Sequence, residues 1–232
     1  DGTKTHEMVL KALYGPVMNV TTTKKLQDQG TLAALDIDII QLNYPKHVRE
    51  SWGKKKYQDE IKFITQYEPR NKFISNLSVG LKGNTLVLFR LVDHGKVLFD
   101  LTKPLIDPNR KMYYIHGGVG TSDRDAVRHI VEKQDDAIIY ASMGTFSTGI
   151  NIRNIHNIVF ASPSKGQIKV LQSIGRGLRL ADNGTTTKLY DIVDDARHMG
   201  YNNFAVKHSG VRIKIYENQL FKFKLHGVDL HE

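Results

Sequence analysis

The chain has 232 residues, no cysteine and a formal net charge of +9. Disulfides, thiolate metal sites and cysteine nucleophiles are therefore excluded, and no paired histidine spacing indicates another metal site. No apolar run reaches the roughly 18 residues that span a bilayer, and no signal-peptide pattern is present, so we expect a cytoplasmic protein with no membrane contact. The basic balance favours a polyanionic partner, nucleic acid ahead of membrane, although an ordinary basic protein has the same composition.

The first part of the chain contains too few predicted elements to form a core of its own. Strands are predicted at residues 18–21 and 37–42, around a short helix at 22–29 that Gly30 ends. Two strands without a further element cannot bury a sizeable core. We therefore interpret residues 1–45 as the C-terminal tail of a preceding domain.

Residues 46–82 show a different pattern, in which a charged stretch after Pro45 leads into two helices. The helices are expected at residues 57–66 and 69–81, and Pro69 suits the first turn of the second one. Because no strand is expected here, we interpret this stretch as connector helices.

Residues 83–196 alternate between short apolar runs and helical spacing. Buried strands are expected at residues 85–89, 111–115, 137–141, 157–161 and 188–193. Helical patterns separate most of them, at 93–101 and again after Ser122, where an S-x-x-D sequence predicts a helix start. This alternation predicts an α/β fold with a parallel sheet, whose ligands bind beyond the carboxyl ends of the strands. Residues 197–232 form a basic C-terminal appendix, a helix followed by a strand.

Four residues at helical spacing stand out in the second half of this domain. Gln172, Gly175, Arg176 and Arg179 have offsets of 0, 3, 4 and 7, so they share one face of a helix. Glycine within a helix costs about 1 kcal/mol relative to alanine, so Gly175 indicates close approach of a ligand or another backbone. Arginine suits phosphate through its planar fork of donors. On spacing alone, the solvated face of an ordinary helix explains the stripe at least as well.

Two loops that follow expected strands contain groups suited to phosphate contacts. Hydroxyl groups and backbone N–H groups of glycine at the carboxyl end of a strand can bind phosphate oxygens. The residues concerned are Ser142, Thr145, Gly149 and Asn151 in one loop, and His116 and Gly117 in the other. Each loop by itself is equally typical of a polar turn.

Together, in this order and at these strand ends, the three pieces resemble the second RecA-like domain of superfamily 2 helicases. Residues 85–93 are similar to motif IV, residues 142–152 to motif V, and residues 172–179 match the Q-x-x-G-R-x-x-R of motif VI. The wider pattern, including F-S-T-G-I-N and K-L-Y-D-I-V-D-D, is most similar to phage helicases of DNA recombination, repair and fork remodelling. The resemblance implies a RecA-like parallel sheet with flanking helices, a P-loop NTPase-type helicase domain 2, preceded by the tail of a first RecA-like domain.

The resemblance also implies roles for the matched positions. Arg176 and Arg179 would be arginine fingers that reach the γ-phosphate of ATP, with Gln172 beside them. The nucleotide would also meet Gly149, Asn151 and Gly175, although many family members have Asp where this chain has Asn151. The residues that would face the nucleic-acid backbone are Phe89, Arg90, His116, Gly117, Ser142 and Thr145.

Two motifs of a complete motor are missing from this chain. It contains no G-x-x-x-x-G-K-[ST] and no acidic D-E-x-H box, so the lysine that binds phosphates and the carboxylates that hold Mg²⁺ would lie in an N-terminal RecA-like domain. We therefore expect the C-terminal motor domain of an ATP-dependent DNA helicase, inactive alone, that acts on single-stranded or branched DNA or on an RNA–DNA hybrid. The main alternative is a non-catalytic, sequence-independent DNA-binding module. A dinucleotide or nucleotide-sugar enzyme is a more distant one, since its glycine fingerprint is absent.

Two further basic stretches are weaker indications of nucleic-acid binding. Trp52 with the lysines at 54–56 forms either a stacking and phosphate-binding patch or a solvated linker. Arg212, Lys214, Lys222 and Lys224 either follow a nucleic-acid strand or cover a small satellite core.

Overall fold

The computed structural model describes residues 8, 9, 12, 35–53, 55–117, 133–144, 154–163 and 186–231. Seven strands in these ranges form one sheet: β1 Leu35–Asn43, β2 Thr85–Phe89, β3 Lys111–Ile115, β4 Ala137–Ser142, β5 Asn157–Phe160, β6 Thr187–Asp195 and β7 Lys222–Asp229. The spatial order is β3-β4-β2-β5-β6-β1-β7, and every neighbouring pair is parallel. The predicted parallel α/β fold is therefore confirmed.

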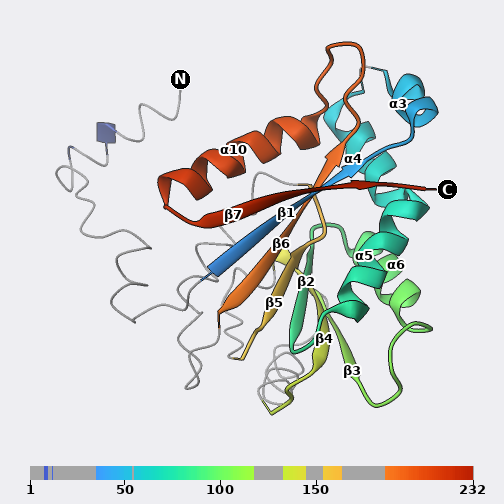
Figure 1. Ribbon diagram of the computed structural model, residues 1–232, viewed down its shortest axis with the longest axis vertical. Coiled ribbons are helices and arrows are strands. Elements are labelled where there is room, and N and C mark those ends of the chain that lie inside the picture. Colours follow the sequence, from blue (N-terminus) through green and yellow to red (C-terminus); the bar gives the residue numbers. More distant parts are fainter. Residues whose placement is uncertain are drawn as a thin grey trace.

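Helices pack on both faces of this sheet (Figure 1). Their bounds are α3 Lys46–Trp52, α4 Tyr57–Gln66, α5 Glu68–Gly80, α6 Val92–Thr102 and α10 Phe204–Asn218. Helices α3 to α6 lie on one side of the sheet, and most of α10 lies on the other. The predicted helices at 57–66, 69–81 and 93–101 correspond to α4, α5 and α6, whereas α3 forms within what the sequence presented as a charged stretch. The predicted elements at 18–21 and 22–29 and the helix after Ser122 lie outside the described residues.

Strand β1 corrects the expected division of the chain. Residues 35–45 were expected in a preceding domain, but β1 pairs with β6 along its whole length and with β7 on its other edge. The physical reason is that Ile37 and Ile39 point to one face of the sheet and Ile40 and Leu42 to the other, so β1 has to be covered on both faces. The strand expected in the C-terminal appendix is likewise part of this sheet, as its edge strand β7. The sheet thus includes residues from both sides of the expected domain at 83–196.

The two cores follow from strict alternation along the strands. In β2, Leu86 and Leu88 belong to the core on the α10 side, and Val87 and Phe89 belong to the core under α4 to α6. All five residues of β2 are buried, as expected for a parallel strand covered on both faces. Helix α6 packs closely on this strand: a Cβ on Gly95 would lie 2.6 Å from the ring of Phe89, so only glycine fits at this position.

The helices in the described ranges are all too short or too polar to cross a membrane.

Candidate functional site

The parallel sheet brings the starts of the two expected loops and the residues after β2 to the same carboxyl edge. Strand β4 lies between β2 and β3, with Phe89 in register with Ser142 and Ile115 in register with Ala141. The residues that follow β2 and β3 therefore begin on either side of Ser142. The remaining predicted site residues, Thr145, Gly149, Asn151, Gln172, Gly175, Arg176 and Arg179, lie outside the described residues.

Arg90 is an exposed cation at this edge, and two contacts fix its place. Its backbone N–H donates to the Ser162 hydroxyl at 3.0 Å, which joins the end of β2 to the segment after β5. Its Nη1 donates to the Tyr57 hydroxyl at 2.9 Å, so the first turn of α4 orients the guanidinium. The side chain remains exposed, as a phosphate contact requires.

Phe89 does not have the expected role. Its side chain is fully buried, and its ring stacks on that of Tyr114 with 5.5 Å between the centroids. The ring also packs against Gly95 of α6. Because Phe89 shares its face of β2 with Val87, alternation directs it into the core, and a nucleic-acid backbone can meet only its main chain.

His116 and Gly117 extend the edge beyond β3. His116 is half-buried, with its ring 5.2 Å from that of Tyr114, and Gly117 is exposed. A Cβ on Gly117 would meet nothing within 4 Å, so the space beside its backbone is open. Ser142 is 8% exposed, so it is buried at the end of β4.

A groove of about 630 Å³ opens next to Arg90. Helix α4 forms one wall and the start of α6 forms the other, with Arg90 and Lys62 as its cations. Leu91, Val92 and Val97 contribute apolar surface and are each more than 40% exposed. The groove therefore offers an apolar lining beside two cations and the carboxylate of Asp93 at the carboxyl end of β2.

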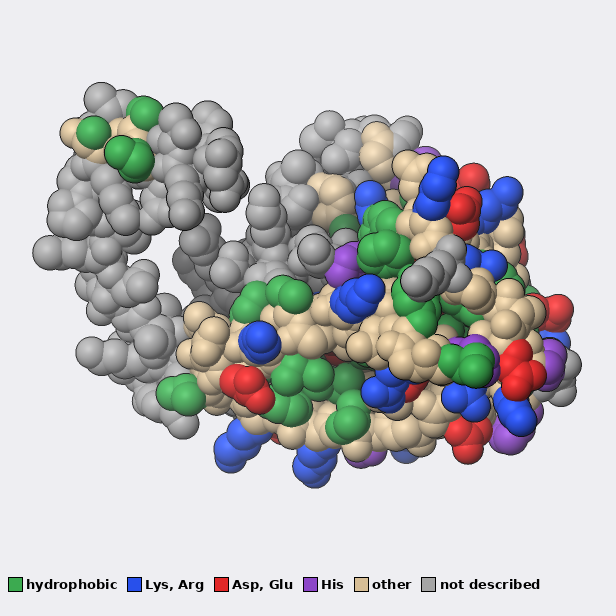
Figure 2. All heavy atoms as spheres, turned by 90° about the horizontal axis from the view of Figure 1, so that it is seen from above, with side chains coloured by type: hydrophobic (Ala, Val, Ile, Leu, Met, Phe, Trp, Pro, Cys, Tyr) green, Lys and Arg blue, Asp and Glu red, His purple; other side chains and the backbone are tan. Residues whose placement is uncertain are grey.

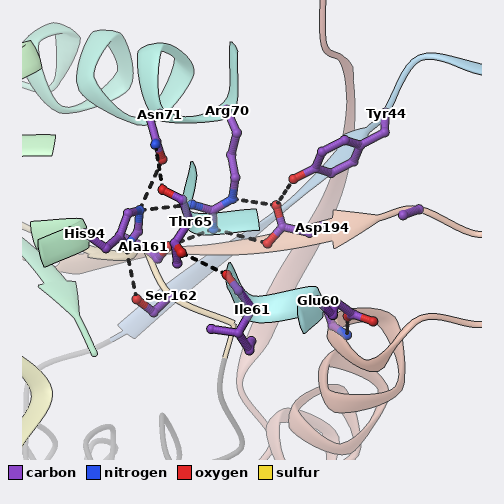
Figure 3. Close-up of polar contacts among 12 residues, drawn as sticks. Tyr44, Glu60, Ile61, Thr65, Arg70, Asn71, His94, Ala161, Ser162 and Asp194 are labelled. Atoms are coloured by element: carbon purple, nitrogen blue, oxygen red, sulfur yellow. Dashed lines mark hydrogen bonds and ion pairs between the residues drawn. The ribbon is translucent and has the colours of Figure 1, made fainter. Parts of the chain in front are cut away.

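A buried ion pair lies directly below this edge (Figure 3). Arg70 of α5 donates to both carboxylate oxygens of Asp194 in β6, through Nε at 2.6 Å and Nη2 at 3.1 Å. Nη2 also donates to the carbonyl of Ala161 at 2.7 Å, and the Tyr44 hydroxyl donates to Asp194 at 3.0 Å. Both charged side chains are fully buried. Arg70 thus connects α5 to the carboxyl ends of β5 and β6.

Electrostatics within this cluster keep its charges fixed. Burial lowers the pKa of Arg70, but Asp194 and Tyr44 outweigh it, so that pKa lies above its ordinary value. Burial, and next the charge of Asp194, raise the pKa of Tyr44 well above its usual range. Arg70 therefore stays charged, and the tyrosine stays a donor.

His94 extends the cluster to the loop of Arg90. Its Nε2 lies 3.1 Å from Asn71 Oδ1, and its Nδ1 lies 3.4 Å from the Ser162 hydroxyl. Asn71 donates its amide N–H to the Thr65 carbonyl, so its oxygen faces the ring at the shorter distance and favours a proton on Nε2, with Nδ1 as acceptor. Arg70 Nη1 lies 3.4 Å from the same Nε2 and could donate to it only in the other tautomer. Burial, and next the cation of Arg70, lower the pKa of His94 to about 3, which keeps the ring neutral. A continuous chain of hydrogen bonds thereby connects the backbone of Arg90 to α5.

A second buried acid fixes α10 to α4. Glu60 accepts the backbone N–H groups of Phe204 and Ala205 at 3.0 and 2.8 Å, and the Asn203 amide at 3.2 Å. Asn203 also donates to the backbone carbonyl of Asp194 at 2.9 Å. A carboxylate at a helix N-terminus is favourable because it faces unpaired N–H groups and the positive end of the dipole. The carboxyl edge is therefore supported from both faces of the sheet.

Sequence reasoning missed these supporting residues. Charged residues are rarely buried, so Arg70 and Asp194 looked like surface groups in the sequence. The available signal was the pair of acids at the end of the apolar run 188–193, because an acid at the carboxyl end of a buried strand needs a partner.

Burial changes the interpretation of the two weaker basic stretches. Trp52 is 3% exposed and packs edge-on against Tyr44 at 5.4 Å between centroids, so it is a core residue. Arg212 is 1% exposed and pairs with Asp191 at 2.8 Å, so its charge is neutralised inside the protein. Lys222 and Lys224 remain exposed on β7.

The surface charges are dispersed. On the face seen from above in Figure 2, Lys and Arg side chains of the described residues are spread among acidic and apolar ones. Among the residues that the structure describes, no group of three His, Asp or Glu side chains is placed to hold a metal ion. The chemistry available here is hydrogen bonding and charge from particular side chains and N–H groups, which suits the phosphates of a backbone.

Comparisons with known proteins agree on the identity of this architecture. Residues 68–181 match the helicase conserved C-terminal domain family. The chain is 35% identical to the ATP-dependent DNA helicase UvsW of Enterobacteria phage T4, over 98% of this chain and 47% of UvsW. It therefore spans about half the length of that relative.

Solved structures give the same result. The crystal structure of T4 UvsW superimposes with a TM-score of 0.75 and 36% identity, over 91% of this chain and 43% of that chain. The DEAD-box protein SrmB of E. coli gives a TM-score of 0.52 at 12% identity, over 84% and 91% of the two chains. The second likeness shows the fold alone, and both structures share the RecA-like sheet with flanking helices.

Proposed function

We propose that this chain, whose residues 68–181 match the helicase conserved C-terminal domain family, is half of an ATP-dependent DNA helicase motor of superfamily 2. The observation that carries the proposal is 35% identity over nearly the whole chain to UvsW, which is an ATP-dependent DNA helicase. An N-terminal RecA-like domain of the same protein supplies the other half. ATP binds in the cleft between the two halves, and closure of the cleft moves the motor along nucleic acid.

The carboxyl edge of the sheet supports a backbone-binding role in this motor. Arg90 presents an exposed guanidinium there, and open space lies beside the backbone of Gly117. Such contacts bind phosphates of any sequence, and their strength falls with salt concentration because counterions are released on binding. We propose single-stranded or branched DNA as the ligand and a role in recombination, repair or fork remodelling.

The catalytic part of the proposal concerns residues outside the described ranges. Arg176 and Arg179 act as arginine fingers on the γ-phosphate, with Gln172 beside them, and Gly149, Asn151 and Gly175 adjoin the nucleotide. Carboxylates of the preceding domain would hold Mg²⁺, and the bound ion would neutralise phosphate charge. The chain by itself then lacks the phosphate-binding lysine and does not hydrolyse ATP.

The test uses the full protein with its N-terminal domain. Arg176→Ala and Arg179→Ala should each lower DNA-stimulated ATPase by about 10³-fold or more while leaving DNA affinity within a few-fold of wild type. Arg90→Ala should do the reverse, with weaker DNA binding and a salt dependence of log Kd reduced by about one unit of slope. Lys96→Ala, which removes an exposed cation paired with Asp100 on α6, is the matched control and should change neither.

Two outcomes would contradict the proposal. If both arginine variants hydrolyse ATP normally while DNA affinity falls, the chain acts as a sequence-independent DNA-binding module. If the isolated chain hydrolyses ATP, it contains a complete site rather than half of one.

A further inference from the structure

A tight turn beyond β6 contains an apolar residue in an unfavourable conformation. His198 and Tyr201 exchange backbone hydrogen bonds of 3.2 and 2.8 Å, which close a two-residue turn. Its central residues Met199 and Gly200 have φ values of 44° and 76°, both in the left-handed region. A turn with two left-handed residues prefers Asn, Asp or Gly at its first central position, and methionine there is costly. Local backbone preference therefore does not explain the choice of Met199.

The packing of the protein does not explain Met199 either. Its side chain is 91% exposed, the highest exposure among the large hydrophobic residues of the described ranges. The segment 196–203 rises beyond the end of β6 to the top of Figure 1. Because all the strands are parallel, this segment emerges from the same edge of the sheet as Arg90 and Gly117. Met199 is thus an apolar tip that is exposed at the same edge of the sheet as the proposed nucleic-acid interface.

Two arginines and a lysine lie close to this turn. Arg49 and Arg197 line a hollow of about 380 Å³ beside the turn, together with Asp195, and Lys207 lies 5.3 Å from the ring centroid of Tyr201. Arg197 binds Asp195 through two nitrogens, but its own side chain is 50% exposed whereas that of Asp195 is 9% exposed. The cations near the turn therefore outnumber the one carboxylate that lines the hollow.

An apolar side chain flanked by cations is the combination by which proteins separate stacked bases. The apolar group enters between bases and disrupts their stacking, while the cations hold the adjacent phosphates. A turn closed by two hydrogen bonds is stiff enough to hold such a tip in place. Resting on the function proposed above, we propose that Met199 contacts the bases at the junction between duplex and single strand and promotes their separation.

The experiment uses the full protein on a forked DNA duplex with 2-aminopurine at the junction. Met199→Asn removes the apolar tip and favours the left-handed backbone, so the fold should be preserved. Unwinding should fall about tenfold and the rise in 2-aminopurine fluorescence on binding should disappear, because unstacking is lost. DNA-stimulated ATPase on single-stranded DNA should stay within twofold of wild type. Met199→Leu keeps an apolar tip and should restore both signals.

The control is another exposed apolar residue in the same backbone region. Leu220 has a φ of 60°, is 63% exposed, and lies after α10 at the opposite edge of the sheet. Leu220→Asn makes the same chemical change and should leave unwinding and fluorescence unchanged.

The proposal is overturned if Met199→Asn unwinds the fork and reports unstacking as wild type does, or if ATPase and unwinding fall in equal measure. Failure of the motor proposal looks different, because the wild-type protein would then show no DNA-stimulated ATPase at all.

Discussion

Replacement of Arg70 by Met tests the buried ion pair under the carboxyl edge. The change leaves the Asp194 carboxylate fully buried, with the Tyr44 hydroxyl as its remaining side-chain donor among the described contacts. The Ala161 carbonyl also loses the donor that lies 2.7 Å away. An uncompensated buried charge of this kind costs about 3–5 kcal/mol. A domain with a total stability of roughly 5–15 kcal/mol should therefore lose a large fraction of it.

The pair between Lys188 and Asp38 provides the control, because its shortest N–O distance is also 2.6 Å. The Lys188 side chain is 42% exposed, whereas Arg70 and Asp194 are 0% exposed. Solvent screens the exposed pair, so Lys188→Met should cost less than about 1 kcal/mol.

Urea unfolding of the three proteins measures the difference directly. Fluorescence of Trp52, the single tryptophan of the chain, reports on this region because its ring packs on Tyr44, which binds Asp194. The double variant Arg70→Met/Asp194→Leu should recover part of the loss, because both charges are then removed. If Arg70→Met costs no more than Lys188→Met, the argument that burial determines the strength of this pair is wrong.

Three other predictions concern helices α6 and α10. Folding lowers the pKa of His94 from its ordinary 6.5 to about 3. The neutral ring therefore contributes to the free energy of unfolding above pH 6.5, and this contribution is lost as pH falls toward 3. At pH 5 this loss is about 2 kcal/mol, and His94→Gln should show a correspondingly smaller fall in unfolding free energy between pH 7.5 and pH 5; an equal fall in both proteins would argue against it. Gly95→Ala should destabilise the protein by about 1–3 kcal/mol in urea, because the new Cβ would meet the ring of Phe89 at 2.6 Å. Gly210→Ala in α10 has open space and should instead stabilise by up to about 1 kcal/mol, and a loss in both variants would show that the contact with Phe89 is not the cause.

The strands were the most predictable part of the fold. The bounds of β2 and β3 match the sequence prediction, because short apolar runs of this length favour strands. All of β2 is buried as expected, whereas β3 lies at the edge of the sheet and is only partly buried. The place of β1 could not be read in the same way. Its apolar pattern shows that it must be covered on both faces, but not which sheet covers it. That depends on pairing with β6, about 150 residues later in the chain.

The position of the candidate site at the carboxyl edge could be predicted from the sequence, but the buried residues that hold this edge in place could not. The carboxyl ends of β2, β3 and β4 were expected to meet, and parallel pairing places Arg90, His116 and Ser142 at neighbouring ends. The same alternation that located β2 also directs Phe89 inward, so its assignment to the nucleic acid was avoidable. His94 and Asn71 depend on contacts between elements, which no local pattern encodes. The proposed roles of Gln172, Arg176 and Arg179 stay predictions.

Strand β1 has a consequence for synthesis of the chain on the ribosome. Its partners are far downstream, and Asn43 binds Asp229 across 186 positions. During translation β1 emerges long before β6 or β7, so both of its edges are exposed while the intervening sequence is made. A nascent strand rich in isoleucine is prone to pair with other chains, and a charge within the strand opposes this. Asp36 and Asp38, which alternate with Ile37 and Ile39, place such charges at the start of β1, where they oppose pairing of the nascent strand with other chains.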